Sequence, residues 1–431
     1  MKTRRSLLTV AVTATLLCAA CGSATSAPGG TTADPSATAA GSQTSVAGGS
    51  ASPAAQVAAP VPAQYQQAYS TLQGQVSAFA AVAEPGPATS ATVISSALEP
   101  ADGNAMHPGI LQGSALQTSI TMISGMRAMG ETGVTVQVSF PLLLSSFPDS
   151  SEYLSFYRQV AAAVHQQGMT LTVEENPLFP NMSGLPVSGF YAGLDLQSFA
   201  ADYQQQAETI ITAMQPRYLS FLNEPDTYTA NLHNPSIRLT DPVTGVEFVN
   251  LVLGGLDRQG TSLCAGSGTW QDASYDQALL DQTSIDCLDL HMYPVAAQDV
   301  SNLQAEVTAA EVAHRPVVMS ECWLYKQSTD GRPVDSVTSA PDEQKDGTFS
   351  FWEPLDSAFL TAMVDYARGH GFAVASPFST ENFFAYQAWT PALEAETPTQ
   401  ARQSFNLLVS QALKEGQLSS LGSAFAGLAR S

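Results

Sequence analysis

Two apolar segments of the sequence each end on a glutamate whose carboxylate could do acid–base or nucleophilic chemistry. The first covers residues 218–222 and is followed two positions later by Glu224 and Pro225. The second covers residues 317–320 and runs directly into Glu321. Segments of this length are typical of buried strands, and the residue before a proline is disfavoured in a helix. The pattern therefore predicts two strand-end carboxylates, which can divide the roles of proton donor and nucleophile.

The elements that must position this pair alternate along the chain from about residue 90. Strand-like apolar runs fall at residues 92–98, 134–140, 170–174, 218–222, 262–266, 287–291, 317–321 and 372–376. Helix-period segments follow them in turn, at residues 117–129, 152–167, 194–214, 246–258, 274–282, 300–313, 356–370 and 399–415. Eight strands that alternate with eight helices predict a parallel sheet closed by right-handed crossovers. We therefore expect an α/β protein, with a (β/α)8 TIM barrel over residues 89–431.

The two glutamates close the fourth and the seventh of these predicted strands. In a TIM barrel, catalytic side chains converge at the carboxyl ends of the strands. Two segments without clear periodicity, residues 227–244 and 326–354, follow the same two strands. Loops of that length usually carry function in a compact domain. We therefore expect both loops to rise over the barrel mouth that holds Glu224 and Glu321.

The N-terminal segment is typical of an exported protein. Residues 1–21 combine basic side chains with a short apolar run, which predicts a lipoprotein signal peptide that is too short to be a stable membrane anchor. The small residues before Cys21 resemble a bacterial lipobox, so we expect Cys21 to be lipidated in a cell-envelope lipoprotein; the alternative is ordinary secretory cleavage. Residues 22–60 are rich in Gly, Ser, Ala and Thr and predict a flexible linker. Residues 61–88 predict a helix packed on the barrel.

The composition narrows the range of partners. The 431 residues include 16 Lys and Arg against 38 Asp and Glu, which gives a formal net charge of −22. This balance disfavours nucleic acid and anionic membrane surfaces as partners. We expect contact with a membrane only through the N-terminal lipid, and we expect a monomer without a cofactor. No Cys/His spacing predicts a zinc site, so no metal is expected.

The cysteines of the barrel leave two possibilities open. Cleavage before Cys21 would leave Cys264, Cys287 and Cys322 as structural cysteines. In an exported protein Cys264 and Cys287 could form a disulfide, because they fall on consecutive predicted strands. Three buried thiols are the alternative.

Three short motifs at predicted strand ends resemble one clan of enzymes. They are residues 223–225 (Asn-Glu-Pro), 291–293 (His-Met-Tyr) and 320–323 (Ser-Glu-Cys-Trp). Together they resemble the retaining (β/α)8-barrel glycoside hydrolases, such as endoglucanases and β-mannanases, whose catalytic glutamates close strands 4 and 7. The resemblance covers roughly residues 90–415 and implies a carbohydrate substrate.

The resemblance implies a role for each glutamate and for three neighbours. Glu224 would be the general acid/base, and Glu321 would be the nucleophile, which has to stay ionised. Repulsion between two carboxyl groups about 5–5.5 Å apart would keep the proton on Glu224. Asn223 would bind the sugar 2-OH. Tyr293 would contact the nucleophile, with His291 nearby.

Three further residues are candidates for substrate binding. Sugar rings stack their C–H faces on aromatic side chains, and Trp270 and Trp323 follow the fifth and seventh predicted strands. Asn176 follows the third strand and could bond a sugar hydroxyl.

The sequence departs from the pattern of the clan in several places. Residues 134–141 contain no arginine to support the nucleophile, and residues 377–378 (Pro-Phe) stand where many members have a tryptophan. Glu174 and Glu175 stand where a His-Asn type of pair is common. Each of them could bind a cationic or hydroxyl-rich substrate, or lie behind the barrel.

Two functions from different classes fit these features. The first is a retaining β-glycoside hydrolase, tethered to the cell envelope, that acts on a poly- or oligosaccharide by double displacement. The second is a barrel lipoprotein that binds glycan without cleaving it, although a binding protein has no need of two carboxylates. A metal-dependent hydrolase is disfavoured, because residues 95–100 contain no histidine.

Overall fold

The computed structural model describes residues 60–84, 91–180, 185–293, 295–326 and 347–431. The predicted signal peptide, Cys21 and nearly all of the predicted linker lie outside the described residues, so lipidation and export stay predictions. Most of the segment 326–354, predicted as a loop, lies outside them as well. In the described part of the chain, no helix has the length and apolar character needed to span a bilayer.

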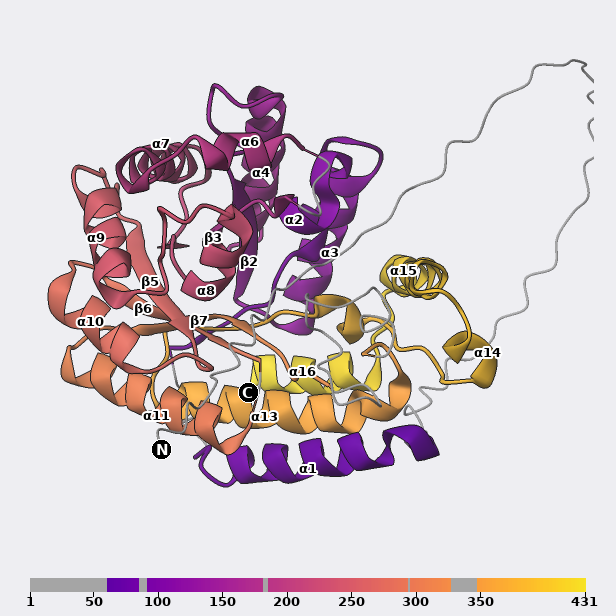
Figure 1. Ribbon diagram of the computed structural model, residues 1–431. Coiled ribbons are helices and arrows are strands. Elements are labelled where there is room, and N and C mark those ends of the chain that lie inside the picture. Colours follow the sequence, from indigo (N-terminus) through magenta and orange to yellow (C-terminus); the bar gives the residue numbers. More distant parts are fainter. Residues whose placement is uncertain (1–59, 85–90, 181–184, 294, 327–346) are drawn as a thin grey trace, which may run out of the picture.

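Eight parallel strands form the centre of the molecule (Figure 1). They are β1 (Val93–Ile94), β2 (Gly133–Phe140), β3 (Thr170–Pro177), β4 (Tyr218–Ser220), β5 (Ser262–Gly268), β6 (Cys287–Met292), β7 (Val317–Cys322) and β8 (Val374–Pro377). Each strand pairs with the next in the chain from β2 to β8, and β8 pairs with β1. A parallel bridge between Ala97 and Thr135 joins the β1 and β2 segments. The predicted (β/α)8 barrel is therefore confirmed, with every predicted strand present.

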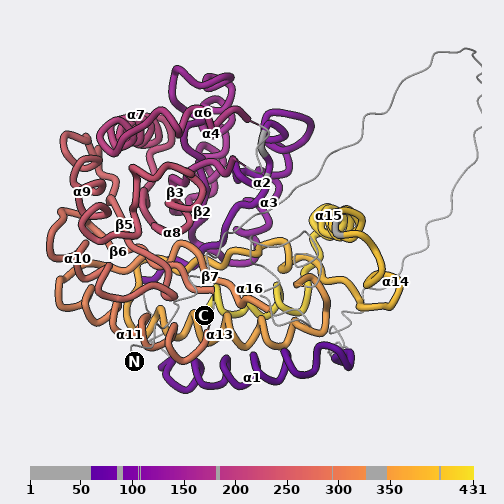
Figure 2. The backbone as a smooth tube through the Cα atoms, viewed as in Figure 1, coloured from indigo at the N-terminus to yellow at the C-terminus, as the bar shows by residue number. Residues whose placement is uncertain are grey.

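Helices surround this barrel in chain order (Figures 1 and 2). The ring is made of α3 (Ala115–Met129), α4 (Ser150–Gln166), α7 (Leu196–Met214), α9 (Pro242–Leu253), α10 (Ser274–Gln282), α11 (Ala297–Val312), α13 (Glu353–Gly369) and α16 (Ser420–Arg430). Helix α16 contacts both α13 and α3, so it completes the ring where the chain ends. The sequence assigned this place to residues 399–415, which form α15 (Pro398–Glu415) instead.

The reason for this correction lies in the side chains of the two helices. Helix α15 buries Phe405 and Val409 but leaves Leu407 72 % exposed, and it protrudes from the ring (Figure 1). Helix α16 packs Phe425 in a stack on Phe383, with the ring centroids 4.5 Å apart. Helix α16 was missed because residues 399–415 already supplied an eighth helical segment; its own residues Leu421, Phe425 and Ala426 recur at helical spacing and are buried.

Short helices occupy parts of the chain predicted as loops. Helix α8 (Pro225–Leu232) begins directly after Glu224 and takes up the first third of the segment 227–244. Proline is favoured at the first position of a helix because its missing N–H has no partner to lose. The other short helices are α2 (Gly103–Met106), α6 (Val187–Ala192) and α14 (Pro391–Glu394).

Helix α1 (Gln66–Ala80) lies along the outside of α13, at the lower edge of Figure 1. Its contacts are aromatic: Tyr69 stacks on Trp352 with centroids 5.7 Å apart, and Phe79 lies 6.1 Å from Phe359. Phe79 is fully buried. The apolar stripe that predicted this helix is thus the face that packs on the barrel.

Residues on the strands alternate between the barrel interior and the helices, as the period of two requires. On β2, Val134, Val136 and Val138 are fully buried. Between them, Thr135 bonds Ser95 of the β1 segment with the two hydroxyl oxygens 3.0 Å apart, so this side chain points into the barrel. The inward-facing side chains of β2 are accordingly polar, whereas its outward-facing valines supply apolar contacts.

The structure decides between the two possibilities for the cysteines. Cys264 and Cys287 face each other on β5 and β6 and form a disulfide. Both pack with Val318 and Val374 in a small apolar cluster. Cys322 is buried and free.

Several carboxyl groups are buried outside the barrel mouth. Burial raises the pKa of Glu131 to about 8, although Ser96 donates a hydrogen bond of 2.7 Å to its Oε2. Burial also raises the pKa of both Asp276 and Glu306, which interact with each other between the barrel wall and the helices. These groups make the fold sensitive to pH, because ionising them inside the protein costs free energy.

Replacing Gly422 by alanine tests the docking of α16. A Cβ at this position would lie 2.0 Å from the backbone oxygen of Phe383, so the helix has to shift. We expect Gly422→Ala to lower the free energy of unfolding by about 1–3 kcal/mol. Gly427→Ala on the same helix is the control, because a Cβ there meets nothing within 4 Å. It should be neutral or stabilising by up to about 1 kcal/mol. Equal effects in urea unfolding would contradict this docking.

The buried carboxyls predict that stability falls as pH rises. A carboxyl whose pKa is raised in the folded state holds its proton there when the unfolded chain has lost it. The free energy of unfolding therefore falls by at most about 1.4 kcal/mol per pH unit per group between the two pKa values. For Glu131 this window ends near pH 8. We expect urea unfolding to give lower stability at pH 8 than at pH 5.5, with a smaller difference in Glu131→Gln. A stability that rises over this range would contradict the prediction.

Candidate active site

The two predicted carboxylates meet at the carboxyl ends of the barrel strands. Glu224 precedes α8, and Glu321 lies on β7, four residues into the strand. Both contact the same imidazole nitrogen: Nδ1 of His291 is 2.9 Å from Glu224 Oε1 and 3.5 Å from Glu321 Oε2. All three side chains are buried. The nearest oxygens of the Glu224 and Glu321 carboxylates therefore lie no further apart than the sum of these two distances to Nδ1 of His291.

Glu321 accepts hydrogen bonds from two neighbours, in addition to its ion pair with His291. The side-chain amide of Gln137 on β2 donates to Oε1, and the hydroxyl of Tyr293 donates to Oε2. Tyr293 is held by a stack on Tyr325, with ring centroids 4.4 Å apart. The contact between Tyr293 and the predicted nucleophile agrees with the expectation from the sequence. Gln137 was not among the predicted site residues.

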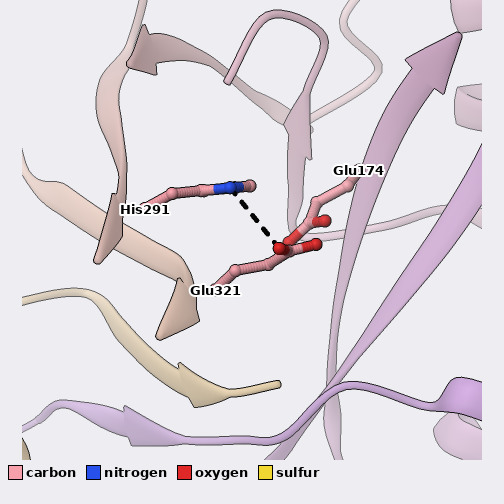
Figure 3. A group of neighbouring side chains, drawn as sticks. All are labelled: Glu174, His291 and Glu321. Carbon is pink, nitrogen blue, oxygen red and sulfur yellow. Dashed lines mark ion pairs between the residues drawn. The ribbon is translucent and has the colours of Figure 1, made fainter. Parts of the chain in front are cut away.

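A third carboxylate, Glu174 on β3, lies beside Glu321. A carboxylate oxygen of Glu174, a ring nitrogen of His291 and a carboxylate oxygen of Glu321 all lie within 4.8 Å of one another. The two carboxyl groups point toward each other (Figure 3). The amide of Gln137 bridges the pair, since it also donates to Glu174 Oε2 at 3.1 Å. Burial and then the charge of Glu174 raise the pKa of Glu321 well above its usual range. This direction opposes the expectation from the sequence that Glu321 stays ionised while the proton is kept on Glu224.

A chain of hydrogen bonds leads from His291 into the barrel. Its Nε2 is 3.1 Å from the hydroxyl oxygen of Ser320, and that hydroxyl lies 2.7 Å from Asp289. Burial alone would lower the pKa of His291, but the carboxylates of Glu321 and Glu224 outweigh it and raise this pKa well above the usual value. A protonated His291 then donates from both ring nitrogens, and Ser320 donates to Asp289.

The amide of Asn223 faces the cleft with an unused donor. Its Oδ1 lies 3.0 Å from the hydroxyl of Tyr228, which is also 2.8 Å from Asn176 Oδ1. The same hydroxyl lies 2.7 Å from the backbone oxygen of Glu175, and it has only one proton to donate among these three acceptors. The Nδ2 group of Asn223 is buried and has no hydrogen-bond partner among the described residues. A buried donor of this kind is costly unless a ligand or water accepts from it.

A cleft opens above these residues. It is lined by Asp102, Asn104, Gln137, Asn176, Phe179, Asn223, Glu224, Thr227, Tyr228, His291, Tyr293, Glu321 and Phe378. The lining thus contains several carboxylates and, among the described residues, no lysine or arginine.

Two of the predicted aromatic platforms are not part of this lining. Trp323 is 2 % exposed and packs under Lys326, whose Nζ lies 4.7 Å from the indole ring. Trp270 donates its indole N–H to Asp226 at 2.9 Å. The structure therefore does not place Trp323 where a sugar could stack on it. Phe378 and Phe179 present aromatic surface to the cleft instead.

The cluster of Glu174, His291 and Glu321 also has the spacing of metal ligands. Metal-binding carboxylates must offer free lone pairs to the cation. Here the amide of Gln137 and the hydroxyl of Tyr293 aim N–H and O–H groups at the same oxygens. These donors fit a hydrogen-bonded carboxylate and would oppose a cation, so we assign no metal to the cluster.

The site residues that the sequence analysis did not predict have a recognisable position in the strand pattern. Gln137 and Glu174 stand on the inward-facing alternate positions of β2 and β3, opposite each other in the strand register. A period-two analysis of both strands together would have placed them at the barrel mouth. Tyr228 was missed because its segment was taken as a loop, whereas it lies on α8, one turn after Glu224.

Comparisons with known proteins concern the fold. No protein-family model matches the chain, and no curated protein matches it. An exo-β-1,4-mannosidase from Opitutaceae bacterium strain TAV5 is 15 % identical, with 79 % of this chain and 59 % of that chain covered and a TM-score of 0.48. GH5_18 from Bifidobacterium longum subsp. longum, solved with Manβ1-4GlcNAc, is 12 % identical over 78 % of each chain, with a TM-score of 0.48.

A β-glucosidase from Exiguobacterium marinum is 10 % identical, with 74 % of this chain and 98 % of that chain covered and a TM-score of 0.43. Similarity at these levels does not transfer an activity. The function of the present chain has to be argued from its own side chains.

Proposed function

We propose that the protein is a retaining β-glycoside hydrolase that acts on a neutral poly- or oligosaccharide. The observation that carries this proposal is the contact of Glu224 and Glu321 with one imidazole nitrogen, at 2.9 and 3.5 Å. The nearest carboxylate oxygens are thereby held closer than the roughly 6.5–9.5 Å at which inverting enzymes place their carboxyl groups. A separation below that range favours direct attack by a carboxylate over attack by a water molecule held between the two groups.

The proposed reaction has two displacements. Glu224 gives its proton to the glycosidic oxygen while an oxygen of Glu321 attacks the anomeric carbon, so that the alcohol leaves and an ester to Glu321 forms. A water molecule then attacks the anomeric carbon as Glu224 takes up one of its protons. The ester bond breaks, Glu321 regains its carboxylate, and the sugar leaves with its original configuration.

The neighbours support this assignment of roles. Tyr293 and Gln137 donate to Glu321, and such donors fix the orientation of a nucleophile and stabilise its anionic form. The unused donor of Asn223 faces the cleft, which suits a hydroxyl oxygen of the substrate. The negative lining without lysine or arginine disfavours acidic sugars.

We also propose that the enzyme acts outside the cytoplasm, either tethered through a lipid on Cys21 or secreted. The arrangement of residues 1–21 supports export, and a disulfide between Cys264 and Cys287 suits an oxidising compartment.

A trapped intermediate tests the nucleophile. A panel of 2-deoxy-2-fluoro aryl β-glycosides should inactivate the protein, because fluorine slows hydrolysis of the glycosyl ester, and peptide mass mapping should find the label on Glu321. Glu321→Ala should lower turnover at least about 1,000-fold. Azide should not restore the product of retained configuration. A protein that binds glycans but takes up no label from any probe would be a glycan-binding barrel, contrary to the proposal.

Leaving-group dependence tests the acid. In Glu224→Ala, hydrolysis of glycosides with poor leaving groups should fall by at least about 100-fold. Activated 4-nitrophenyl glycosides need little protonation and should lose far less in the first displacement. Asp226→Asn serves as the control, since this neighbouring carboxylate lies outside the cleft lining. Equal losses on both kinds of substrate would exclude Glu224 as the acid.

A further inference from the structure

The barrel mouth brings together several carboxyl groups whose side chains have little exposure to solvent. Glu174, Glu321 and Asp289 are at most 4 % exposed, and His291 is the cation among them. Ionised carboxylates at such a site are costly unless cations or donors balance each of them. Protons held between neighbouring carboxyl groups remove part of this cost.

Glu174 is the member of this group with the fewest donors. Its Oε2 accepts from Gln137, and its Oε1 is buried without a hydrogen-bond partner among the described residues. Glu321, by contrast, accepts from Gln137 and Tyr293 and lies 3.5 Å from His291. Donors and a nearby cation stabilise the ionised form of a carboxyl group. Two buried carboxyl groups that face each other can also share one proton, so that the pair carries a single negative charge.

We propose that Glu174 is a positioning residue that shares one proton with the nucleophile Glu321, in a hydrogen bond between the two carboxyl groups. The bond satisfies the orphaned oxygen of Glu174 and fixes the carboxyl group of Glu321 for attack. It leaves the pair with one negative charge instead of two, at a cleft whose described lining contains no arginine or lysine.

The surroundings of the pair set the pH at which the shared proton is lost. Glu224 and Asp289 oppose a further negative charge on the pair, whereas protonated His291 from β6 favours it. Tyr228 from α8 lies near Glu174 and is neutral, because burial raises its pKa well above the usual value. The two carboxyls titrate as one pair. At alkaline pH the pair loses its proton, and the two carboxylates repel each other.

The first test needs no substrate. Infrared difference spectra of wild type and Glu174→Gln at pH 7, in H2O and D2O, should show the loss of a protonated carboxyl band. Glu175→Gln supplies the reference band, because the neighbouring Glu175 is fully buried and burial raises its pKa well above the usual value. Loss of an ionised carboxylate band in Glu174→Gln would overturn the proposal.

The second test rests on the proposed function. With 4-nitrophenyl β-mannoside and β-glucoside as probes, Glu174→Gln keeps a neutral donor and should retain kcat/KM within about threefold at the pH optimum. Glu174→Ala removes the hydrogen bond and should lose roughly 10- to 100-fold. Glu175→Gln should match wild type. In a Glu224→Ala background the acid/base no longer titrates, so the remaining loss of rate at alkaline pH is assigned to the pair of Glu174 and Glu321. Adding Glu174→Gln to this background should abolish that loss.

The two tests fail separately. If wild type hydrolyses no glycoside, the proposed function is wrong, while the infrared spectra still decide whether Glu174 carries a proton. If Glu174→Gln is as impaired as Glu174→Ala, with folding of both verified by circular dichroism, Glu174 acts as an anion and the proposal is wrong.

Discussion

The dominant constraint on this structure is negative charge confined in a dry barrel mouth. Four carboxyl groups, on Glu174, Glu224, Glu321 and Asp289, lie around one imidazole, His291. Each carboxyl must find a cation, a donor or a proton, because an unpaired buried charge costs several kcal/mol or more. The residues around the site supply these cations, donors and protons.

The groups that balance these carboxyls come from different strands, and this explains why the barrel is needed. The donor of Gln137 belongs to β2, the hydroxyl of Ser320 to β7, and the imidazole of His291 to β6. Parallel strands end at one face, so their inward side chains form layers in which residues distant in sequence touch. The polar interior of this barrel therefore serves the site, and the apolar outer face of the strands supplies cohesion with the helices.

Stability is supplied mainly away from the mouth. The disulfide of Cys264 and Cys287 lies in an apolar cluster at the other end of the strands, and α13 packs between α1 on its outer side and α16 beside it in the ring. Because the stabilising contacts lie elsewhere, the barrel mouth can contain buried polar groups without a hydrogen-bond partner, such as the amide N–H group of Asn223. Protein function commonly occupies such locally unfavourable places, which the rest of the fold can support.

The sequence by itself determined the barrel, because alternation of strand and helix periods is local and repeats eight times. It also determined the two glutamates, since a strand end followed by proline or by an aromatic motif can be recognised within a few residues. The contact between Glu174 and Glu321 was decided only by the tertiary structure, as was the exclusion of Trp323 from the cleft. Both depend on which strands lie opposite each other and how deep each side chain sits. The same holds for the choice of α16 over α15 as the eighth helix of the ring, which is set by the close packing of Gly422 on Phe383.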